Sequence, residues 1–593
     1  MLTRRLIALF VLCGVSLPAQ GTSHHHRITD PLTAQQSAHL AAEFDTFPNE
    51  HGGVDVIVLP EEMRSFKRLG FRTKLIARGR PFAQIAAAER PDTRYYTATE
   101  ILAKIDSVAA AYPQLAKRVN LSALPGAAKT HNGQNIYALK VSDNVATEEK
   151  EPSILLAAEH HARELNAPVM VIGAMERVLK GYATDPKLKS LVDEYELFFV
   201  PCVNPDGTDY VWTNDNLWRK NRRNNGGGRY GVDNNRNYPF LWGRCGSSTS
   251  TSSQIYRGPS PASEPETRTM MALQRIYRPE IYLDVHSSGR EVLFTYAPCA
   301  TVNSTIRGLI DRYKHLLRNP MSYAHRAPSA SGEAPEYHWS EGTMSFLIEV
   351  MTSFQPSYSS ALTEEARVWK GFYPALTTWR PAVRGHVTSI FKNQPVTASI
   401  RYTPNLISHG EGNGSRARDG RYAMWLPLGS HSVTWSATGF RSVTKTIRIT
   451  NFDRPQTHDI VMVPNMPLAV LTKSGTTRIG MTTALTYTST GDIGETYWVV
   501  LAVGESPGIP LGAGRVLPLN ADALFFATLR PNALLLNNTG LIPPGGKATA
   551  SFVIPNLPGL VGITVYAAGV TQNNDYLNSV KNFSSAISMK IQR

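Results

Sequence analysis

The sequence predicts an α/β domain in the middle of the chain, a small α+β unit before it and two all-β sandwich modules after it. Between residues 92 and 380, short apolar runs alternate with helical segments; the runs are "IYALKVS", "SILLAAEH", "LFFVPCVNPDG", "IYLDVHS" and "SFLIEVM". Such runs are typical of strands buried on both faces of a sheet. After about Pro381, short alternating runs rich in Gly, Pro, Thr and Val replace the helical periodicity, which indicates β-sandwiches.

The first residues predict a signal peptide over residues 1–21. Two arginines precede an apolar run from Leu6 to Leu17, and a small residue, Ala19, follows it. The run is too short to span a bilayer, and no later apolar stretch reaches spanning length. We therefore expect a secreted protein without a transmembrane segment.

A small α+β unit is predicted over residues 22–91. Residues 54–80 contain an apolar run, a stretch with apolar residues at helical spacing, then Gly70 and a second apolar run. This order predicts strand, helix, strand. The three histidines at 24–26 are expected to form a solvated tract at a mobile terminus, with a weak metal chelator as the alternative.

The α/β domain is predicted over residues 92–380 and to begin with a helix. Thr97 and Glu100 form a capping box at its start. Its apolar stripe consists of Ile101, Leu102, Ile105, Val108 and Tyr112. Polar residues that could bind a metal or transfer protons stand at the ends of the strands that follow, where open α/β sheets bind their ligands.

Four of these polar residues predict a metal site. His161 and Glu164 follow one strand, His286 ends another and Glu349 lies in a third. Two imidazoles and a carboxylate form a catalytic zinc set with one open position, and a free carboxylate beside it can act as the general base. The local stretch "AAEHHARE" leaves open whether His160 or His161 works with Glu164, since both spacings fit one face of a helix or turn.

Three further motifs lie between the HxxE pair and the second histidine. They are "NPDG" at residues 204–207, "LWRK" at 217–220 and "GVDNNRNYP" at 231–239. In this order and spacing, residues 92–380 closely resemble the zinc carboxypeptidases of the A, B and T type. The resemblance implies a mixed central sheet with helices on both faces, one bound zinc ion, and hydrolysis of C-terminal residues from peptides or proteins.

The resemblance also assigns the metal site. It implies that His161 and Glu164, with His286, are the zinc ligands, and that His160 turns away from the ion. Glu349 matches the family's general base, which takes a proton from the attacking water and returns it to the leaving amine.

Roles in substrate binding follow in the same way. Arg219 matches the arginine that polarises the scissile carbonyl and stabilises the oxyanion. Asn235 and Arg236 match the pair that binds the terminal carboxylate of the substrate. Asp233 matches the carboxylate that orients the first zinc histidine, and Arg163 matches a subsite arginine that reaches the substrate backbone.

The chain departs from the family at the substrate lid. Pro328 stands where the family usually has a tyrosine before an "ASG"-like turn, and Tyr323 lies nearby but out of register. The residues after the turn leave the preferred C-terminal side chain open between an apolar or aromatic group and Lys or Arg. These residues are Glu333, Ala334, Pro335 and Glu336.

The flanking units resemble known partners of this fold. The N-terminal unit lies where the family carries an inhibitory pro-segment, so we expect either a zymogen opened by a trypsin-like protease at exposed Arg90 or Arg94, or a permanent cap. Residues 381–465 resemble a transthyretin-like module. Residues 466–593 resemble repeats at the ends of large secreted bacterial proteins. Each of the two modules could serve as a spacer, as a folding aid or for attachment to a cell surface.

Composition and cysteine content restrict the other readings. The formal net charge is +14, but the basic residues are scattered, so nucleic-acid binding is not expected. Cys13 lies in the signal, Cys202 is expected to be buried, and a bridge between Cys245 and Cys299 is expected.

Two other functions stay open on the same scaffold. They are a cell-wall peptidase that cuts γ-D-glutamyl-diaminopimelate peptides, and a catalytically weak protein that binds peptides or surfaces. The presence of Glu349 argues against the second. The carboxylate-binding pair Asn235 and Arg236 argues against an acylase with a related zinc site.

Overall fold

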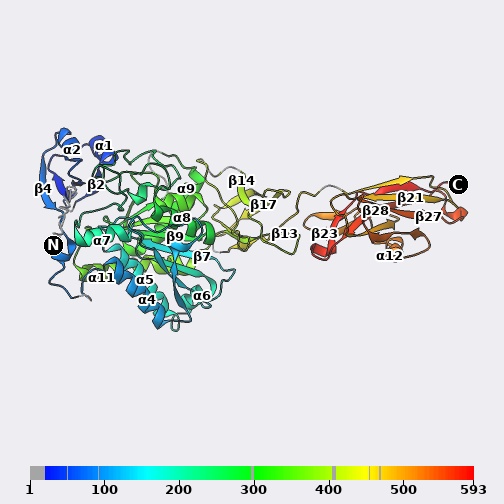
Figure 1. Cartoon of the computed structure of the whole chain (residues 1–593), viewed down its shortest axis with the longest axis horizontal. Coiled ribbons are helices and arrows are strands. Elements are labelled where there is room, and N and C mark those ends of the chain that lie inside the picture. Colours follow the sequence, from blue (N-terminus) through cyan, green and yellow to red (C-terminus); the bar gives the residue numbers. More distant parts are fainter. Residues whose placement is uncertain are drawn as a thin grey trace, which may run out of the picture.

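The computed structural model describes residues 21–49, 51–90, 93–294, 300–403, 406, 409–452, 454–466 and 469–593. The predicted signal peptide lies outside the described residues except for Gly21. Figure 1 shows the N-terminal unit and the α/β domain together at one end of the molecule, with the two β modules following in a row.

One eight-stranded sheet forms the centre of the α/β domain. Its strands are β5 (Ala116–Asn120), β6 (Tyr137–Val141), β7 (Ser153–Ala158), β8 (Glu196–Val200), β9 (Ile281–Ser287), β10 (Glu291–Phe294), β11 (Ala324–Arg326) and β12 (Met344–Val350). Their order in the sheet is β11-β10-β12-β9-β7-β8-β6-β5. The central strands β12, β9, β7 and β8 are parallel, whereas β10 and β6 pair antiparallel with their inner neighbours. The predicted mixed α/β sheet is therefore confirmed.

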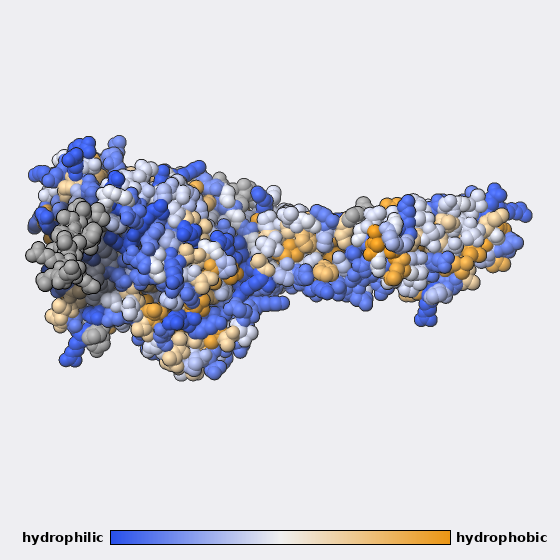
Figure 2. Space-filling view, in the orientation of Figure 1, coloured by the Kyte–Doolittle hydropathy of each residue, from blue (hydrophilic) through white to orange (hydrophobic). Residues whose placement is uncertain are grey.

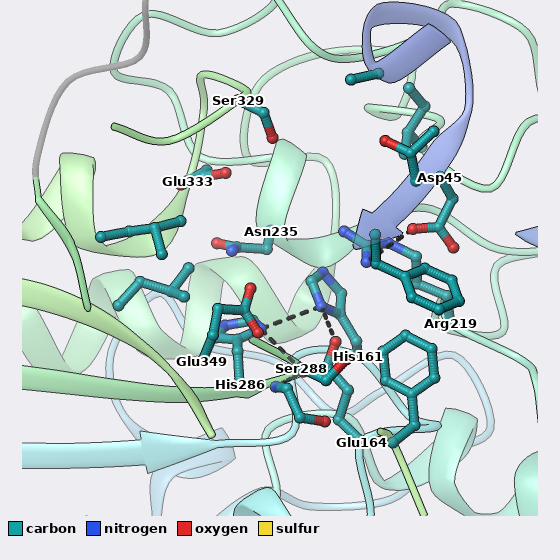
Figure 3. Close-up of a pocket in the computed structure, with 18 of the residues that line it drawn as sticks. Asp45, His161, Glu164, Arg219, Asn235, His286, Ser288, Ser329, Glu333 and Glu349 are labelled. Carbon is teal, nitrogen blue, oxygen red and sulfur yellow. Dashed lines mark hydrogen bonds and ion pairs between the residues drawn. The ribbon is translucent and has the colours of Figure 1, made fainter. Parts of the chain in front are cut away.

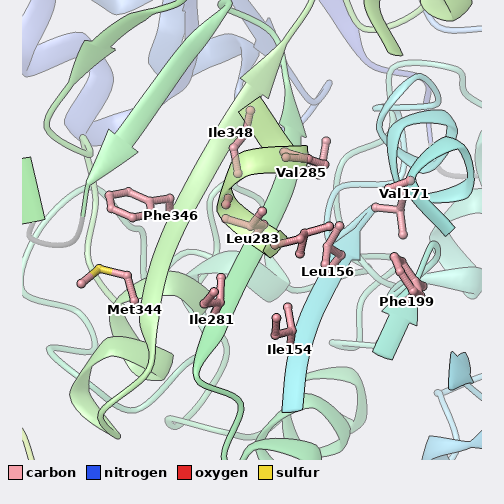
Figure 4. Packing of buried hydrophobic residues seen from close by; sticks show 14 of the residues in the cluster. Ile154, Leu156, Val171, Phe199, Ile281, Leu283, Val285, Met344, Phe346 and Ile348 are labelled. Carbon is pink, nitrogen blue, oxygen red and sulfur yellow. The ribbon is translucent and has the colours of Figure 1, made fainter. Parts of the chain in front are cut away.

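Helices cover both faces of this sheet. They are α4 (Ala98–Ala111), α5 (Ala167–Gly181), α6 (Pro186–Glu194), α7 (Pro205–Thr213), α8 (Pro265–Tyr277), α9 (Ser304–Met321), α10 (Ala334–Ser340) and α11 (Tyr358–Thr378). Successive side chains of a strand point to opposite faces. In β7, Ile154 and Leu156 pack with residues of α5, whereas Leu155 and Ala157 pack with residues of α8 and α10. Figure 4 shows the first of these two cores.

The predicted start of the domain is also found. α4 has the capping box between Thr97 and Glu100, and it buries Ile101, Ile105 and Val108. In this first segment the sequence pattern and the fold agree because capping and amphipathicity are both local.

The N-terminal unit is a four-stranded antiparallel sheet with two helices. Its elements are β1 (His24–Ile28), α1 (Ala34–Glu43), β2 (Asp45–Pro48), β3 (Val54–Val58), α2 (Met63–Arg68) and β4 (Thr73–Arg78). The order is β2-β3-β1-β4, so the predicted strand, helix, strand is present as β3, α2 and β4. The histidine tract is not the mobile terminus that we expected: it forms β1 and pairs with both β3 and β4.

The joint to the α/β domain contains the short helix α3 (Phe82–Ile85). Arg90 is exposed as expected, but Arg94 is not. The Arg94 guanidinium contacts Glu100 at 2.6 Å and lies over the ring of Trp212. This pairing with the α/β domain explains why Arg94 is partly buried.

The C-terminal part consists of β modules. The first contains β13 (Val383–Ser389), β14 (Ser399–Thr403), β15 (Arg421–Met424), β16 (Gly429–Ser436), β17 (Val443–Ile449), β18 (Gln456–Thr457) and β19 (Ile460–Met462). The second contains β20 (Val470–Ser474), β21 (Thr482–Thr488), β22 (Thr496–Ala502), β23 (Ile509–Gly512), β24 (Arg515–Leu517), α12 (Ala523–Thr528), β25 (Leu535–Leu536), β26 (Thr539–Leu541), β27 (Lys547–Val553), β28 (Thr564–Gln572), β29 (Val580–Phe583) and β30 (Ile587–Lys590). Each has its strands in two main sheets, as predicted for sandwiches.

Surface and cysteine features complete the description. Hydrophilic residues cover most of the face of the α/β domain seen in Figure 2, and none of the described helices combines the length and apolarity needed to cross a membrane. Cys202 is a free, buried cysteine. Cys245 is disulfide-bonded, and its predicted partner Cys299 lies outside the described residues.

The first β module shares one apolar core with the α/β domain. Trp425, just after β15, packs edge-on against Tyr313 of α9, and its indole N–H donates to the carbonyl of Glu280 at 3.0 Å. Ion pairs of Arg384 with Glu280 and of Arg418 with Glu196 surround this contact.

We expect Trp425→Ala to destabilise the α/β domain and the first module together. Deleting a buried tryptophan costs about 3–5 kcal/mol, and here the cavity would open in the shared core. Urea unfolding followed by tryptophan fluorescence measures the change. Leu428→Ala, at a position that is 51% exposed, is the matched control and should leave the midpoint nearly unchanged.

Candidate active site

Three side chains converge at the carboxyl ends of β7 and β9. After β7 the chain makes a turn in which the Glu164 N–H donates to the His161 carbonyl, so His161 and Glu164 point the same way before α5 begins. His161 Nδ1 lies 2.8 Å from Glu164 Oε1 and 3.1 Å from His286 Nδ1, and His286 Nδ1 lies 3.1 Å from Glu164 Oε2. The structure therefore places Glu164 against His161, at the spacing of three residues.

This donor set fits one zinc ion. Ligand atoms on a tetrahedral zinc lie about 3.3 Å apart, which is close to the separations found here. All three residues are buried, and both histidines direct Nδ1 toward the carboxylate. Burial, aided by the charge of Arg219, lowers the pKa of His161, which favours the neutral imidazole that a metal requires.

Asp233 lies behind His161. Its Oδ1 is 3.0 Å from His161 Nε2, and its Oδ2 accepts from Arg219 Nε at 2.9 Å. Burial opposes ionisation, but the charge of Arg219 and the hydrogen bond from His161 hold the pKa of Asp233 well below its usual range. Asp233 is thus an ionised carboxylate that fixes the orientation of the His161 ring and of the Arg219 guanidinium together.

A second carboxylate lies behind His286, and sequence reasoning did not identify it. Asp284 Oδ2 is 3.1 Å from His286 Nε2. Both residues belong to β9, and residues two apart in a strand share a face. The "DVH" spacing in the sequence was therefore the signal that could have found it.

Glu349 stands beside the donor set on the neighbouring strand. It is the register partner of His286 in the parallel pair β12 and β9, and its side chain faces the same pocket (Figure 3). Burial, together with the nearby charge of Glu164, raises the pKa of Glu349 to about 8. A carboxylate with a pKa near neutrality can both accept and return a proton.

Asn235 and Arg236, the candidates for binding the terminal carboxylate, come from the long connection between α7 and α8. Asp233 caps the short turn Asn234–Arg236, and this turn directs Asn235 into the pocket. Asn235 Oδ1 accepts from the Ala334 N–H at 2.7 Å. Arg236 donates from Nε to the Gly246 carbonyl and contacts Glu333 from Nη1 at 3.2 Å.

Eight of the nine predicted site residues line one pocket, and Asp233 lies directly behind it. The eight are His161, Arg163, Glu164, Arg219, Asn235, Arg236, His286 and Glu349. His160, as predicted, is not among the residues that line the pocket; it lies behind His286 instead.

The N-terminal unit contributes a residue that the sequence did not predict. Asp45, at the start of β2, reaches into the pocket and lies 2.5 Å from Arg163 and 3.4 Å from Arg219 (Figure 3). Phe47 packs edge-on against Phe354, which also lies under the Arg163 guanidinium. The cavity that remains is about 70 Å³, which holds several waters.

Pro328, which stands where the family usually has a tyrosine, leaves this side of the pocket without one among the described residues. Pro328 is buried. The hydroxyl of Tyr323 donates to Glu364 at 2.6 Å, away from the pocket. Ser329 and Glu333 lie on this side instead.

A buried His, Glu, His set with a free carboxylate at its open side, on a mixed α/β sheet, is the arrangement found in metal-dependent hydrolases. Residues 101–388 match the zinc carboxypeptidase family. Carboxypeptidase B of Helicoverpa zea is 30% identical over 268 residues, which cover 44% of this chain and 60% of that protein. The zinc carboxypeptidase of Saccharothrix mutabilis subsp. capreolus is 33% identical over 229 residues, which cover 37% of this chain and 50% of that protein.

A solved structure shows the same fold. Carboxypeptidase A from Helicoverpa armigera superposes with a TM-score of 0.50 at 20% sequence identity, covering 60% of this chain and 96% of that one. The match to the two curated relatives spans half to three-fifths of their length.

Proposed function

We propose that this protein is a secreted zinc metallocarboxypeptidase that removes C-terminal residues from peptides or proteins. The observation that carries the proposal is the convergence of His161, Glu164, His286 and Glu349 in one pocket with Arg219. We assign residues 1–21 as signal, 22–91 as pro-segment, 92–380 as catalytic domain, and 381–465 and 466–593 as β modules that serve as spacer or surface-binding units.

In this proposal His161, Glu164 and His286 hold the zinc. Bound zinc would supply a Lewis acid that activates water and polarises the scissile carbonyl. Glu349 removes the proton of the attacking water and delivers it to the leaving amine. Asp233 keeps the proton of His161 on Nε2, so that Nδ1 stays free to bind.

Cationic and amide groups hold the peptide in this proposal. Arg219, whose side chain is buried, donates to the oxyanion that develops on the scissile carbonyl. Asn235 and Arg236 bind the terminal carboxylate. Arg163 contacts the backbone before the scissile bond, where the ring of Phe354 fixes its guanidinium.

We expect the mature protein to release the last residue of blocked dipeptides, and Glu349→Gln to lower kcat by about 10²- to 10⁴-fold while zinc remains bound. A panel ending in Phe, Leu, Arg, Lys or Glu, assayed after limited trypsin treatment, measures this. 1,10-Phenanthroline should abolish release, and zinc should restore it.

The opposite result is equally informative. If a folded, zinc-loaded protein releases no residue from any substrate of the panel, the carboxypeptidase proposal is wrong. Cleavage of γ-D-glutamyl-diaminopimelate peptides would then support the cell-wall peptidase, and no cleavage of either substrate would support a binding protein.

The N-terminal unit is proposed to keep the enzyme latent. Asp45 neutralises Arg163 and Arg219, two groups that the substrate needs, and the segment around it fills the pocket. Removing one partner of a buried ion pair is strongly unfavourable, so Asp45 also holds the unit in place.

We expect Asp45→Ala to raise the activity of the uncleaved protein at least about tenfold, because a lost buried ion pair costs about 3–5 kcal/mol of docking energy. Hydrolysis rates before and after trypsin measure the latency. Asp30→Ala removes an exposed ion pair with Arg72 in the same unit and should leave latency unchanged. Equal latency in the Asp45 variant would count against inhibition by this residue.

Glu333 favours a basic C-terminal residue in the substrate. It is buried, faces the pocket and contacts Arg236, whereas Glu336 turns back to the Gly332 N–H and does not line the pocket. A substrate carboxylate on Arg236 would place a second negative charge beside Glu333. A Lys or Arg side chain supplies the compensating charge, and an apolar side chain does not.

We therefore expect release of Lys and Arg to exceed release of Leu and Phe, and Glu333→Gln to lower kcat/KM for the basic substrates about 10- to 100-fold. A charged hydrogen bond contributes about 1.5–3 kcal/mol, which gives this range. Apolar substrates should change little, and Glu336→Gln is the matched control. An equal loss on both substrate classes would show that Glu333 does not select the side chain.

A further inference from the structure

His160 and Asp284 form a buried pair behind His286. The His160 ring stacks on the His286 ring, with centroids 5.6 Å apart and planes 14° from parallel. His160 Nδ1 lies 3.1 Å from Asp284 Oδ1, while Asp284 Oδ2 lies 3.1 Å from His286 Nε2. One carboxylate therefore joins two imidazoles, and all three residues are fully buried.

Tyr238 is the last member of this row, which consists of His286, Asp284, His160 and Tyr238. Its hydroxyl lies 2.9 Å from His160 Nε2, and it too is fully buried. The backbone of His160 is also held, since Asn204 Nδ2 donates to its carbonyl at 3.2 Å. His160 can thus neither rotate toward the pocket nor exchange its partners with water.

The row fixes the protons of both rings. His286 Nδ1 faces Glu164 and His161, so the proton of a neutral His286 ring must sit on Nε2, where it meets Asp284. The proton of a neutral His160 ring then sits on Nδ1, against the other oxygen of Asp284. The Tyr238 hydroxyl donates to the remaining nitrogen, His160 Nε2.

The two ligand histidines are supported differently. Asp233, behind His161, is also held by Arg219, which lines the pocket. Asp284, behind His286, is held by His160, which does not line the pocket. The support of His286 is therefore closed off from the substrate.

We propose that His160 and Asp284, completed by Tyr238, are positioning residues for the metal-binding His286. They fix the tautomer and the plane of the His286 ring. By fixing them, they increase the affinity of the site for zinc. This inference rests on the proposed function, in which His161, Glu164 and His286 hold the ion. Outer partners of this kind commonly change metal affinity about 10- to 100-fold.

The test measures zinc affinity of the full chain by competition with a chromophoric chelator. Asp284→Asn and His160→Phe should each weaken zinc binding about 10- to 100-fold. His160→Asn offers an amide N–H in place of Nδ1 and should recover affinity to within about threefold of the natural protein. His131→Gln, at a histidine paired with Glu264 instead, is the control and should bind as the natural protein does.

A spectroscopic readout separates positioning from loss of folding. In the zinc-loaded natural protein, ¹⁵N NMR of the imidazoles should show His286 protonated on Nε2 and His160 on Nδ1. The visible spectrum of the cobalt-substituted protein should change in His160→Phe and return in His160→Asn. The opposite His286 tautomer, or unchanged spectra and affinities in both disruptive variants, would overturn the inference.

The zinc site itself is tested in parallel. If His161→Ala and His286→Ala lose zinc while Asp284→Asn and His160→Phe keep natural affinity, only the positioning role is wrong. If His161→Ala and His286→Ala bind zinc as the natural protein does, the zinc site of the proposed function is wrong, and the positioning role is wrong with it.

Discussion

The parallel pairing of β7, β9 and β12 is the constraint on which the site depends. Parallel strands bring their carboxyl ends to one edge, and the register sets His286 beside Glu349 there. A slip of one residue in β12 would turn Glu349 to the opposite face of the sheet. The buried apolar residues that set this register, such as Leu283 and Ile348, therefore also position the chemical groups.

Charge balance in the pocket links the proposed latency to the proposed substrate binding. Arg219 lies between Asp233 and Asp45, and Arg163 also contacts Asp45. Buried charges are unfavourable without partners, so the departure of Asp45 leaves two guanidinium groups that need new ones. In the proposed activation, Arg163 and Arg219 therefore lose Asp45 when the N-terminal unit leaves. A peptide backbone can supply the polar partners that they then need.

Sequence reasoning predicted the parts of the site whose signals are local. The donors His161 and Glu164 are close in the chain, and His286 and Glu349 stand in strands that short apolar runs reveal. Asp45 gave no such signal, because its role arises only when β2 docks against Arg163 and Arg219, which lie more than a hundred residues away in sequence. The strand at His24–His26 was missed for the same reason, since its pairing with β3 and β4 and the contact of His25 with Asp55 are long-range.

The position of Asp45 also defines how the proposed latency works. Asp45 contacts Arg163 and Arg219, whereas Glu333 pairs with Arg236. Figure 3 shows Asp45 and Arg219 on one side of Asn235 and Glu333 on the other. On the proposed roles, Asp45 does not imitate the terminal carboxylate of a substrate. It occupies the path of the chain before the scissile bond, which every peptide substrate must follow whatever its last residue. The side that selects the last residue is left intact, so latency and specificity can vary independently on this scaffold.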